Sequence, residues 1–374
     1  MDFELTEQEK MLQNMAKDFA ENEVKPKAAE IDRTNQFPTE LAKRIGQLGF
    51  QGLPYPEKYG GSGAGYLSFA IALEQVCKAS VSAGAIMSVN TVPEEGIYRF
   101  GNEEQKKRLL TPLAKGTKLA GIGFTEPDTG SDPTMIKTTA KRSGKGWLIN
   151  GQKMFMSLAP VADNILLFAK NEQGTINAYI IDAKAKGFSV QEVLDTMGIR
   201  GFGTSIVNLD DLFVPEENLI GKEGEGFNIL LEAISIERMS VAVQAVGIAQ
   251  AALELSIDYA KQRIAQGKPI ARMQAIQQLL AEMAARTEAA RWLTYRCAYL
   301  RDKGESIQYH GSLDKIFASS VAVEVTRMAM EIHGSFGAMK TLPIERLYRE
   351  AKMTEMYVGT SEVHRSIVAN RLIR

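Results

Sequence analysis

Residues 147–151, Trp147-Leu148-Ile149-Asn150-Gly151, place a short β-rich run beside a turn dipeptide. Asn-Gly between two such runs is a strong signal for a two-residue hairpin turn. Further runs follow at 164–169, 176–181 and 205–209, and turn residues separate each from the next. The spacing predicts a compact β unit from about residue 120 to about residue 215.

Helical periodicity flanks this β unit on both sides. Thr6 and Glu9 form a capping-box pattern, and Met11, Met15 and Phe19 then fall on one helical stripe. A glycine-rich stretch at 221–226 closes the β unit and leads into long apolar-periodic segments. We therefore expect a mainly α protein with a central β domain. The expected parts are an N-terminal helical domain (1–118), a middle β domain (119–227) and a C-terminal helical bundle domain (228–374).

Composition excludes several classes of partner. The 374 residues carry 44 Lys+Arg against 45 Asp+Glu, so no global field favours nucleic acid or an anionic membrane surface. The first 24 residues contain no apolar run of signal-peptide or membrane-spanning length, which indicates a cytoplasmic protein without membrane insertion.

Cysteine and histidine usage indicates no metal site. Cys77 and Cys297 are far apart and lack a CxxC spacing, so we expect two buried thiols rather than a disulfide or zinc site. His310, His333 and His364 show no metal-ligand spacing, and we interpret them as structural or surface residues.

Residues 123–132, Gly-Phe-Thr-Glu-Pro-Asp-Thr-Gly-Ser-Asp, are rich in small and hydroxyl-bearing side chains. Backbone N–H groups and hydroxyls in such a loop can approach a phosphate or a flavin edge closely. A plain surface turn has the same composition, so this stretch alone leaves both interpretations open.

Five segments, taken in order, resemble the acyl-CoA dehydrogenase family over essentially the whole chain. Residues 124–132 are similar to the family's TEPxxGSD signature, and residues 150–157 to NGxKxWIT. Residues 263–269 resemble RxxFGxP, residues 332–337 resemble ILGGxG, and residues 357–362 resemble YEGTSE. The resemblance implies the family fold, with a helical N-terminal domain, a middle β-barrel-like domain and a C-terminal four-helix bundle, usually assembled as a homotetramer.

The resemblance also implies FAD and the residues that would bind it. Phe124, Thr125 and Ser131 would lie along the flavin ring and pyrophosphate, with Phe155 and Ser157 at the ring's other edge. Thr360 and Glu362 would lie near the FAD phosphates and adenine, and Arg263 would reach the FAD of a neighbouring subunit.

Several positions depart from the family pattern. Phe155 replaces the usual Trp, Gln266 replaces the Phe of RxxFGxP, and His333, Ser335 and Phe336 alter ILGGxG. Val358 occupies the place of the glutamate that acts as catalytic base in many members. The base that removes the substrate α-proton must then come from elsewhere.

Glu237 is the candidate base. It interrupts an apolar helical stripe formed by Leu230, Ile234 and Val241, so we expect it to be partly desolvated, with a raised pKa. Glu237-Arg238 resembles the base site of the isovaleryl-CoA and long-chain branches of the family. An ion pair of Glu237 with Arg238 or a neighbouring helix is the alternative. Arg238 either supports the site electrostatically or forms an ordinary ion pair.

Glu94 and Glu95 align with the family segment that lines the acyl pocket. Either they begin a solvated helix, or Glu94 contacts a polar acyl group or takes part in proton transfer. The substrate-binding residues expected from the resemblance are Ser131, Arg238, Thr91, Glu94, Tyr357, Val358 and Gly359.

The sequence predicts an FAD-dependent acyl-CoA dehydrogenase that acts on an acyl-CoA substrate, with a weak preference for branched, cyclic or otherwise bulky acyl groups. No GxGxxG lies between a strand and a helix, so an electron-transferring flavoprotein is the expected electron partner. Three alternatives stay open: an enoyl-CoA reductase using the same partner, a non-redox FAD-retaining lyase or desulfinase, and a catalytically idle acyl-CoA or flavin binder.

Overall fold

The computed structural model describes residues 4–373, and its first part is helical. The N-terminal helices are α1 (Glu7–Phe19), α2 (Lys25–Thr34), α3 (Thr39–Gln47), α4 (Gly65–Ala79), α5 (Val81–Phe100), α6 (Glu103–Gln105) and α7 (Thr111–Ala114). The predicted capping box is confirmed: the Glu9 backbone N–H donates to Thr6 Oγ1, and the Thr6 backbone N–H donates to Glu9 Oε2. Of the predicted stripe, Phe19 is buried, whereas Met11 and Met15 are exposed.

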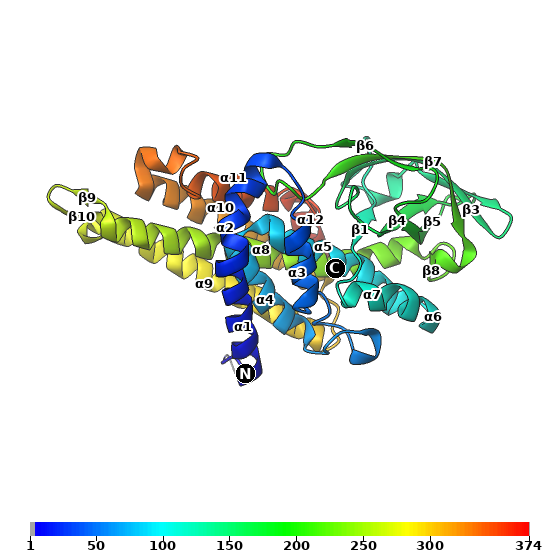
Figure 1. Cartoon of the computed structure of the whole chain (residues 1–374), viewed down its shortest axis with the longest axis horizontal. Coiled ribbons are helices and arrows are strands. Elements are labelled where there is room, and N and C mark those ends of the chain that lie inside the picture. The colour runs from blue at the N-terminus through cyan, green and yellow to red at the C-terminus, as the bar shows by residue number, and fades with distance from the viewer. Residues whose placement is uncertain (1–3, 374) are drawn as a thin grey trace.

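The middle part is a sheet. Its strands are β1 (Ala120–Gly123), β2 (Thr139–Ser143), β3 (Gly146–Met156), β4 (Asn164–Lys170), β5 (Ile176–Asp182), β6 (Phe188–Val193), β7 (Ser205–Pro215) and β8 (Leu219–Ile220). They are ordered β6-β7-β3-β2-β4-β5-β8, with β1 parallel to β4. The predicted β unit is therefore confirmed, and Figure 1 shows it at one end of the long helices.

The predicted hairpin at Asn150-Gly151 is wrong. Both residues lie inside β3, which pairs with β2 on one side and β7 on the other, and the register with β7 shifts between Ile149 and Gly151. The β2–β3 turn instead falls at Gly144, whose φ is +57°. Asn150 uses its amide to bridge the bulge, since its Nδ2 donates to Asp211 Oδ1 at 2.9 Å. A bulge and a hairpin turn recruit the same residue types, which is why the sequence pattern misled.

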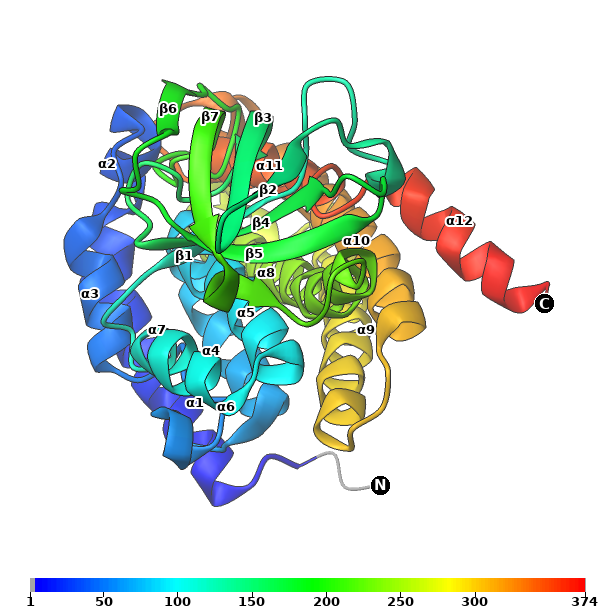
Figure 2. The ribbon, with the colours of Figure 1, turned by 90° about the vertical axis from the view of Figure 1, so that its right-hand side faces the viewer.

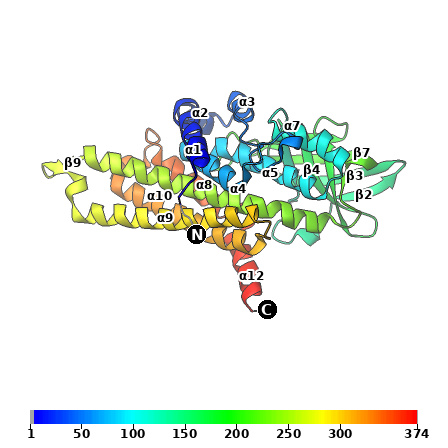
Figure 3. The same ribbon diagram turned by 90° about the horizontal axis from the view of Figure 1, so that it is seen from below.

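The last part is again helical. It comprises α8 (Gly226–Gln262), α9 (Gln274–Asp302), α10 (Gln308–His333), α11 (Ile344–Thr354) and α12 (Ser361–Leu372), with a small hairpin of β9 (Ile264–Ala265) and β10 (Lys268–Pro269) after α8. α8, α9 and α10 run side by side along the length of the molecule, and α12 projects away from them (Figures 2 and 3).

α8 is the central element of the core. It packs against α10, α9, α5 and α4, and it also contacts β5 of the sheet. It is long and apolar enough to cross a membrane by composition, but most of its apolar window is buried inside the protein, as in a core helix. The predicted fold is confirmed: helical N-terminal and C-terminal domains flank a middle sheet domain.

Candidate active site

Glu237 lies on the buried face of α8, where only 3% of its surface is exposed. Its Oε1 accepts a hydrogen bond from Ser88 Oγ of α5 at 3.1 Å, whereas Oε2 is buried without a hydrogen-bond partner. Burial raises the pKa of Glu237 to about 8, and the Ser88 hydrogen bond offsets only part of this effect. The expected desolvation is confirmed. A carboxyl group with this pKa exchanges protons near neutral pH, as a general base must.

Two residues that the sequence analysis missed link Glu237 to the turn after α11. Gln244, about two helical turns further along α8, donates from Nε2 to Ser88 Oγ at 2.8 Å. Tyr357 in turn donates from its hydroxyl to Gln244 Oε1. Ser88 and Gln244 interrupt apolar helices in the way that Glu237 does, and that signal could have revealed them.

The turn at 357–360 has a constrained backbone. Val358 has a φ of +58°, which is rare for a β-branched residue, and Gly359 has a φ of +89°. Its two carbonyls are held from outside: His364 Nε2 lies 3.1 Å from the Val358 oxygen, and Lys315 Nζ donates to the Gly359 oxygen at 2.8 Å. Thr360 caps α12 through its side chain. Val358 occupies a rigid site but offers no group that accepts a proton.

Arg238 lies in a cluster of basic side chains beside this turn. It donates to Ser312 Oγ at 3.4 Å, and the Nδ1 of His364 lies 3.2 Å from the same oxygen. Within residues 4–373 no carboxylate lies within salt-bridge distance of Arg238, and its Nε is buried without a partner. Burial lowers the pKa of Arg238 to about 10, and burial together with Arg238 lowers the pKa of Lys315 to about 7. Burial lowers the pKa of His364 to about 3, so Arg238 is the member of this cluster that keeps its positive charge above pH 7.

Glu94 and Glu95 do not begin a solvated helix, so that interpretation is wrong. Both are fully buried in the middle of α5, which continues through Pro93. Glu95 pairs with Arg301 and, at 2.7 Å, with Arg99. The acidic pair looked like a helix start because proline is common there, but the apolar residues before it already form the helix.

Glu94 itself is less completely paired. Its Oε1 accepts from Asn90 Nδ2 at 3.1 Å, its Oε2 has no partner, and burial raises its pKa well above the ordinary range. Thr91, on the same helix, donates to the Ser88 carbonyl at 2.6 Å.

The loop after β1 is fixed by one buried ion pair. Lys153 Nζ of β3 contacts Glu126 Oε1 at 2.8 Å and the Phe124 carbonyl at 3.2 Å. Burial lowers the pKa of Lys153 to about 8, while Lys153 and hydrogen bonds from residues 137 and 138 overcome the effect of burial on Glu126 and lower its pKa. The Met154 N–H also donates to the Thr125 carbonyl at 2.8 Å. The chain on both sides of the loop is therefore held to β3.

The residues expected at a flavin present a suitable set of groups. Phe155 lies at the register shift near the end of β3, where its φ is +54°, and it is 54% exposed, unusual for a large aromatic side chain. Ser131 is exposed, and Phe124, Thr125 and Ser157 are partly exposed. Aromatic faces beside hydroxyl groups suit a planar, hydrogen-bonding isoalloxazine ring and its phosphates. The residues present fit FAD.

Two expected FAD residues are exposed. Arg263 lies at the end of α8, where its guanidinium stacks on Phe336 with 5.6 Å between the group and the ring centroid. The adjoining β9–β10 hairpin is at the opposite end of the molecule from the β3 loop in Figure 1. Glu362 is on the first turn of α12 and pairs with Arg365 at 3.1 Å. Within one chain, Arg263 does not join the other candidate residues.

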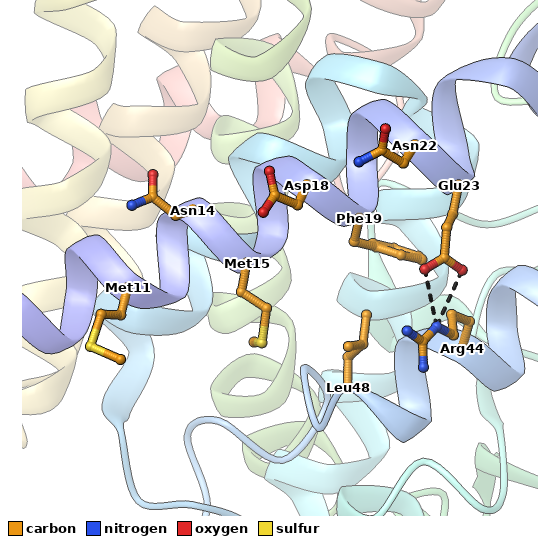
Figure 4. Close-up of a pocket in the computed structure, with 9 residues that line it drawn as sticks. All are labelled: Met11, Asn14, Met15, Asp18, Phe19, Asn22, Glu23, Arg44 and Leu48. Atoms are coloured by element: carbon orange, nitrogen blue, oxygen red, sulfur yellow. Dashed lines mark hydrogen bonds and ion pairs between the residues drawn. The ribbon is translucent and has the colours of Figure 1, made fainter.

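Two surface pockets lie apart from these residues. One, of about 500 Å³, lies over α1 and α3, with Met11, Met15 and Leu48 along it and the Glu23–Arg44 pair at one end (Figure 4). The other, of about 1130 Å³, is bordered by α2, α4, α8 and α11 and contains charges of both signs. No candidate site residue lines either pocket.

Comparison with known proteins gives matches over nearly the whole chain. Three family models match. The model of the acyl-CoA dehydrogenase N-terminal domain matches residues 6–117, that of the middle domain residues 121–212, and that of the C-terminal domain residues 224–373.

Two relatives are similar over their full length. The short-chain-specific acyl-CoA dehydrogenase of Clostridium acetobutylicum is 40% identical, with 100% of both chains covered. The acryloyl-CoA reductase (NADH) of Anaerotignum propionicum is also 40% identical, with 100% of this chain and 96% of the relative covered.

Three solved structures share the fold. Butyryl-CoA dehydrogenase from Megasphaera elsdenii has a TM-score of 0.98 at 36% identity, with 100% of both chains covered. A chain of the structure described as the electron transferring flavoprotein of Acidaminococcus fermentans has a TM-score of 0.98 at 39% identity over 100% of both chains. An acyl-CoA dehydrogenase complexed with FAD from Bacillus anthracis has a TM-score of 0.94 at 33% identity, with 99% of this chain and 68% of that chain covered.

These relatives correct the expected branch. The Glu237-Arg238 pair suggested the isovaleryl-CoA and long-chain branches, but the chain is nearer to proteins named for short-chain and butyryl-CoA substrates. Two matching residues on one helix report the local position of a carboxylate, whereas similarity over the whole chain reports the branch. The position of the carboxylate and the branch are thus separate features.

Proposed function

The chain belongs to the acyl-CoA dehydrogenase family and is an FAD-dependent oxidoreductase acting on CH–CH bonds, and we propose that Glu237 is the base that removes the α-proton of its acyl-CoA substrate. One observation carries this proposal. Glu237 is a buried carboxylate with a pKa of about 8 and one oxygen without a partner. Val358, at the usual base position, has no titratable group.

The chemistry needs a base that holds a proton only transiently. The thioester carbonyl acidifies the α-carbon, and Oε2 of Glu237 is the oxygen left to accept that proton. FAD, when bound, accepts the hydride that leaves the β-carbon. Arg238, beside the 357–360 turn, supplies positive potential next to the site. We propose that it stabilises negative charge on the substrate, together with Tyr357, Val358 and Gly359 of the turn.

We assign FAD binding to the residues that fit it. Phe124, Thr125 and Ser131 would hold the ring and pyrophosphate, with Phe155 and Ser157 at the other edge. Thr360 and Glu362 would contact the phosphates and adenine. Because Arg263 lies at the end of α8, and the adjoining β9–β10 hairpin is far from β3, its assignment to FAD requires a second subunit. We propose the homotetramer that the family resemblance implies.

Residues on α5 complete the proposed substrate site. Thr91 and Glu94 belong to it because α5 packs directly against α8 and carries the hydroxyl that bonds Glu237. For Glu94 we favour contact with the acyl group over proton transfer. Its hydrogen-bond partner is Asn90, and no hydrogen bond joins it to Glu237 within the described part of the chain.

The direction of the reaction has two candidates. The same base and cofactor geometry serve dehydrogenation and its reverse, enoyl-CoA reduction. Relatives named acryloyl-CoA reductase (NADH) and 3-(aryl)acrylate reductase favour the reverse direction, whereas those named acyl-CoA dehydrogenase favour the forward one. We propose dehydrogenation as the activity, with reduction as the second candidate.

We also propose an electron partner, a location and an acyl group for the protein. An electron-transferring flavoprotein is the proposed partner, in line with the structure described for Acidaminococcus fermentans, and the cytoplasm is the proposed location. Moving the base from the 358 turn to α8 reshapes the pocket and favours bulky acyl groups, whereas the names of the relatives favour short ones. We propose a short acyl chain that tolerates a branch or ring.

Anaerobic titration of the FAD-loaded protein tests these proposals together. Butyryl-, isovaleryl- and arylpropionyl-CoA, and their enoyl counterparts after dithionite reduction, are added while flavin absorbance is followed. Bleaching by one saturated thioester, with no bleaching by NADH alone, is the expected result. Binding of thioesters without any flavin change in either direction would contradict the proposed activity.

A further inference from the structure

Three polar side chains from separate parts of the chain lead to Glu237 through the buried core. Tyr357 follows α11, Gln244 is on α8, and Ser88 is on α5. Gln244 and Ser88 are fully buried. We propose that Tyr357, Gln244 and Ser88 form a positioning chain that fixes the Glu237 carboxylate through Oε1 and leaves Oε2 as the proton-accepting atom. The reaction role of Oε2 rests on the proposed function, whereas the positioning chain rests on the hydrogen bonds among these side chains.

The hydrogen bonds of this chain all point toward the carboxylate. The Tyr357 hydroxyl donates to Gln244 Oε1, Gln244 Nε2 donates to Ser88 Oγ at 2.8 Å, and Ser88 Oγ donates to Glu237 Oε1 at 3.1 Å. A hydroxyl that accepts a hydrogen bond becomes a better donor, so each link strengthens the next one. The positioning chain therefore stabilises the ionised form of Glu237 against the cost of burial.

Ser88 also has a second acceptor. Its hydroxyl lies 3.2 Å from the Ala85 carbonyl on its own helix, only 0.1 Å farther than Glu237 Oε1 at 3.1 Å. When Glu237 is neutral, Ser88 can turn its proton to this carbonyl without leaving it unsatisfied. When Glu237 ionises, the hydroxyl can return to Oε1. The serine can thus follow the charge of the base without a rotation of the helix.

The positioning chain holds the Glu237 carboxylate in place and does not conduct protons to it. A primary amide passes a proton only through an unfavourable imidic acid form, and Gln244 stands in the middle of the chain. Protons therefore do not travel from Tyr357 to Glu237 by this route. Ser88, Gln244 and Tyr357 are positioning residues, and their loss should change the pKa and geometry of Glu237 rather than remove a reacting group.

The titratable groups around Glu237 can be separated from it experimentally. Cys77 of α4 and Tyr357 interact electrostatically with it, but burial raises the pKa of both well above the ordinary range, so they stay neutral near pH 8. Glu350 of α11 interacts with these two groups, and burial raises its pKa to about 7. On α8 itself Arg238 stays charged, and across α10 burial lowers the pKa of Lys315 to about 7. Glu350, Glu94 of α5 and Asp314 of α10 are further buried carboxyl groups whose raised pKa values can add protonated carboxyl signals.

Infrared titration of the FAD-loaded protein tests the chain directly. The protonated carboxyl band of Glu237 is isolated as the difference between each protein and the same protein carrying Glu237→Gln, which cancels the signals of Glu350, Glu94 and Asp314. We expect Ser88→Ala to raise the pKa of Glu237 by about one unit, because it loses one hydrogen bond to a charged group. Gln244→Met should raise the pKa less, and Tyr357→Phe least, because their effects reach Glu237 through the remaining links.

Ser256→Ala is the matched control. Ser256 is also buried on α8, but its hydroxyl donates at 2.7 Å to the Ala252 carbonyl, away from Glu237. It should leave the Glu237 band and its pKa unchanged. The proposal is overturned if Ser88→Ala leaves the pKa unchanged, or if Ser256→Ala shifts it as much. An effect on folding alone would lower stability without this graded order.

This test is separate from that of the proposed function. The titration reports the carboxyl group without substrate, so it is valid even if Glu237 is not the catalytic base. Conversely, a Glu237→Gln protein that still reduces flavin normally would refute the base assignment, while the graded pKa shifts would still support the chain.

Discussion

Glu237→Gln is the perturbation that most directly tests the active site. Glutamine keeps the volume of the side chain and can still accept the Ser88 hydrogen bond, but it cannot take a proton. A positioned general base contributes about 10²–10⁴ in rate, so flavin reduction should slow by about that factor. FAD content should stay unchanged, because Glu237 is not among the residues assigned to the cofactor.

The wild-type pH profile gives a second magnitude, worked from the pKa of about 8. The ionised fraction of Glu237 is then about one tenth at pH 7 and about nine tenths at pH 9. The second-order rate of flavin bleaching should therefore rise about tenfold between these values, with a midpoint near pH 8. The residual rate of Glu237→Gln should not show this rise.

The same burial predicts a stability difference of known sign. The folded-state pKa of Glu237 lies above its ordinary value of 4.5, so its favourable contribution is complete below about pH 4.5 and is lost as pH rises through about pH 8. The difference of about 3.5 pH units corresponds to at most about 5 kcal/mol at 1.36 kcal/mol per unit. Glu237→Gln should therefore become progressively more stable than wild type over this window.

Stopped-flow absorbance under anaerobic conditions measures the rate, with the thioester that bleaches wild type fastest. Thermal unfolding from pH 5 to pH 9 measures the stability difference. Reduction by Glu237→Gln within about threefold of wild type, about 0.7 kcal/mol in barrier, would refute its role as base. A stability difference that does not change with pH would refute the account of its burial.

Three further predictions concern the loop, the turn and the distal hairpin. Lys153→Met should cost about 3–5 kcal/mol in denaturant unfolding, because Glu126 is left buried without its cation. Adding Glu126→Gln, which removes the charge while its amide oxygen can still accept a hydrogen bond from residue 138, should restore much of it, and an equal loss in both proteins would contradict this. Val358→Gly should raise the melting temperature, since a β-branched residue at a φ of +58° costs about 1–2 kcal/mol; a lower melting temperature at full FAD content would show that the turn is unstrained. The Arg263→Ala protein should release FAD faster on dilution than the control Lys268→Ala, whose residue lies on the adjoining β9–β10 hairpin. Equal FAD retention by the two proteins would place Arg263 outside the cofactor site.

The order of helices, sheet and helices could be predicted from sequence because the spacing of apolar residues, which differs between helices and strands, is a local property of the sequence. The hairpin at Asn150-Gly151 could not be predicted correctly, because the choice between a turn and a bulge depends on whether β7 continues the sheet beside β3, a pairing set by residues more than fifty positions away. The burial of Glu94 and Glu95 was missed for the same reason. Arg301, the cation that pairs with Glu95, is on α9, far away in the sequence.

Glu237 could be found from sequence because one carboxylate on an apolar helical stripe is a conspicuous exception. Its partners were harder to recognise. Ser88 and Gln244 are uncharged, and helices bury such residues at little cost whenever a partner is close. Only the crossing of α5 over α8, together with the return of the chain at Tyr357, shows that they share one set of hydrogen bonds. The proposed base can lie on α8 while Val358 keeps its strained backbone conformation in the 357–360 turn. His364 and Lys315 hold the carbonyls of that turn independently of the side chain at position 358, so the turn can still deliver the Tyr357 hydroxyl to Gln244.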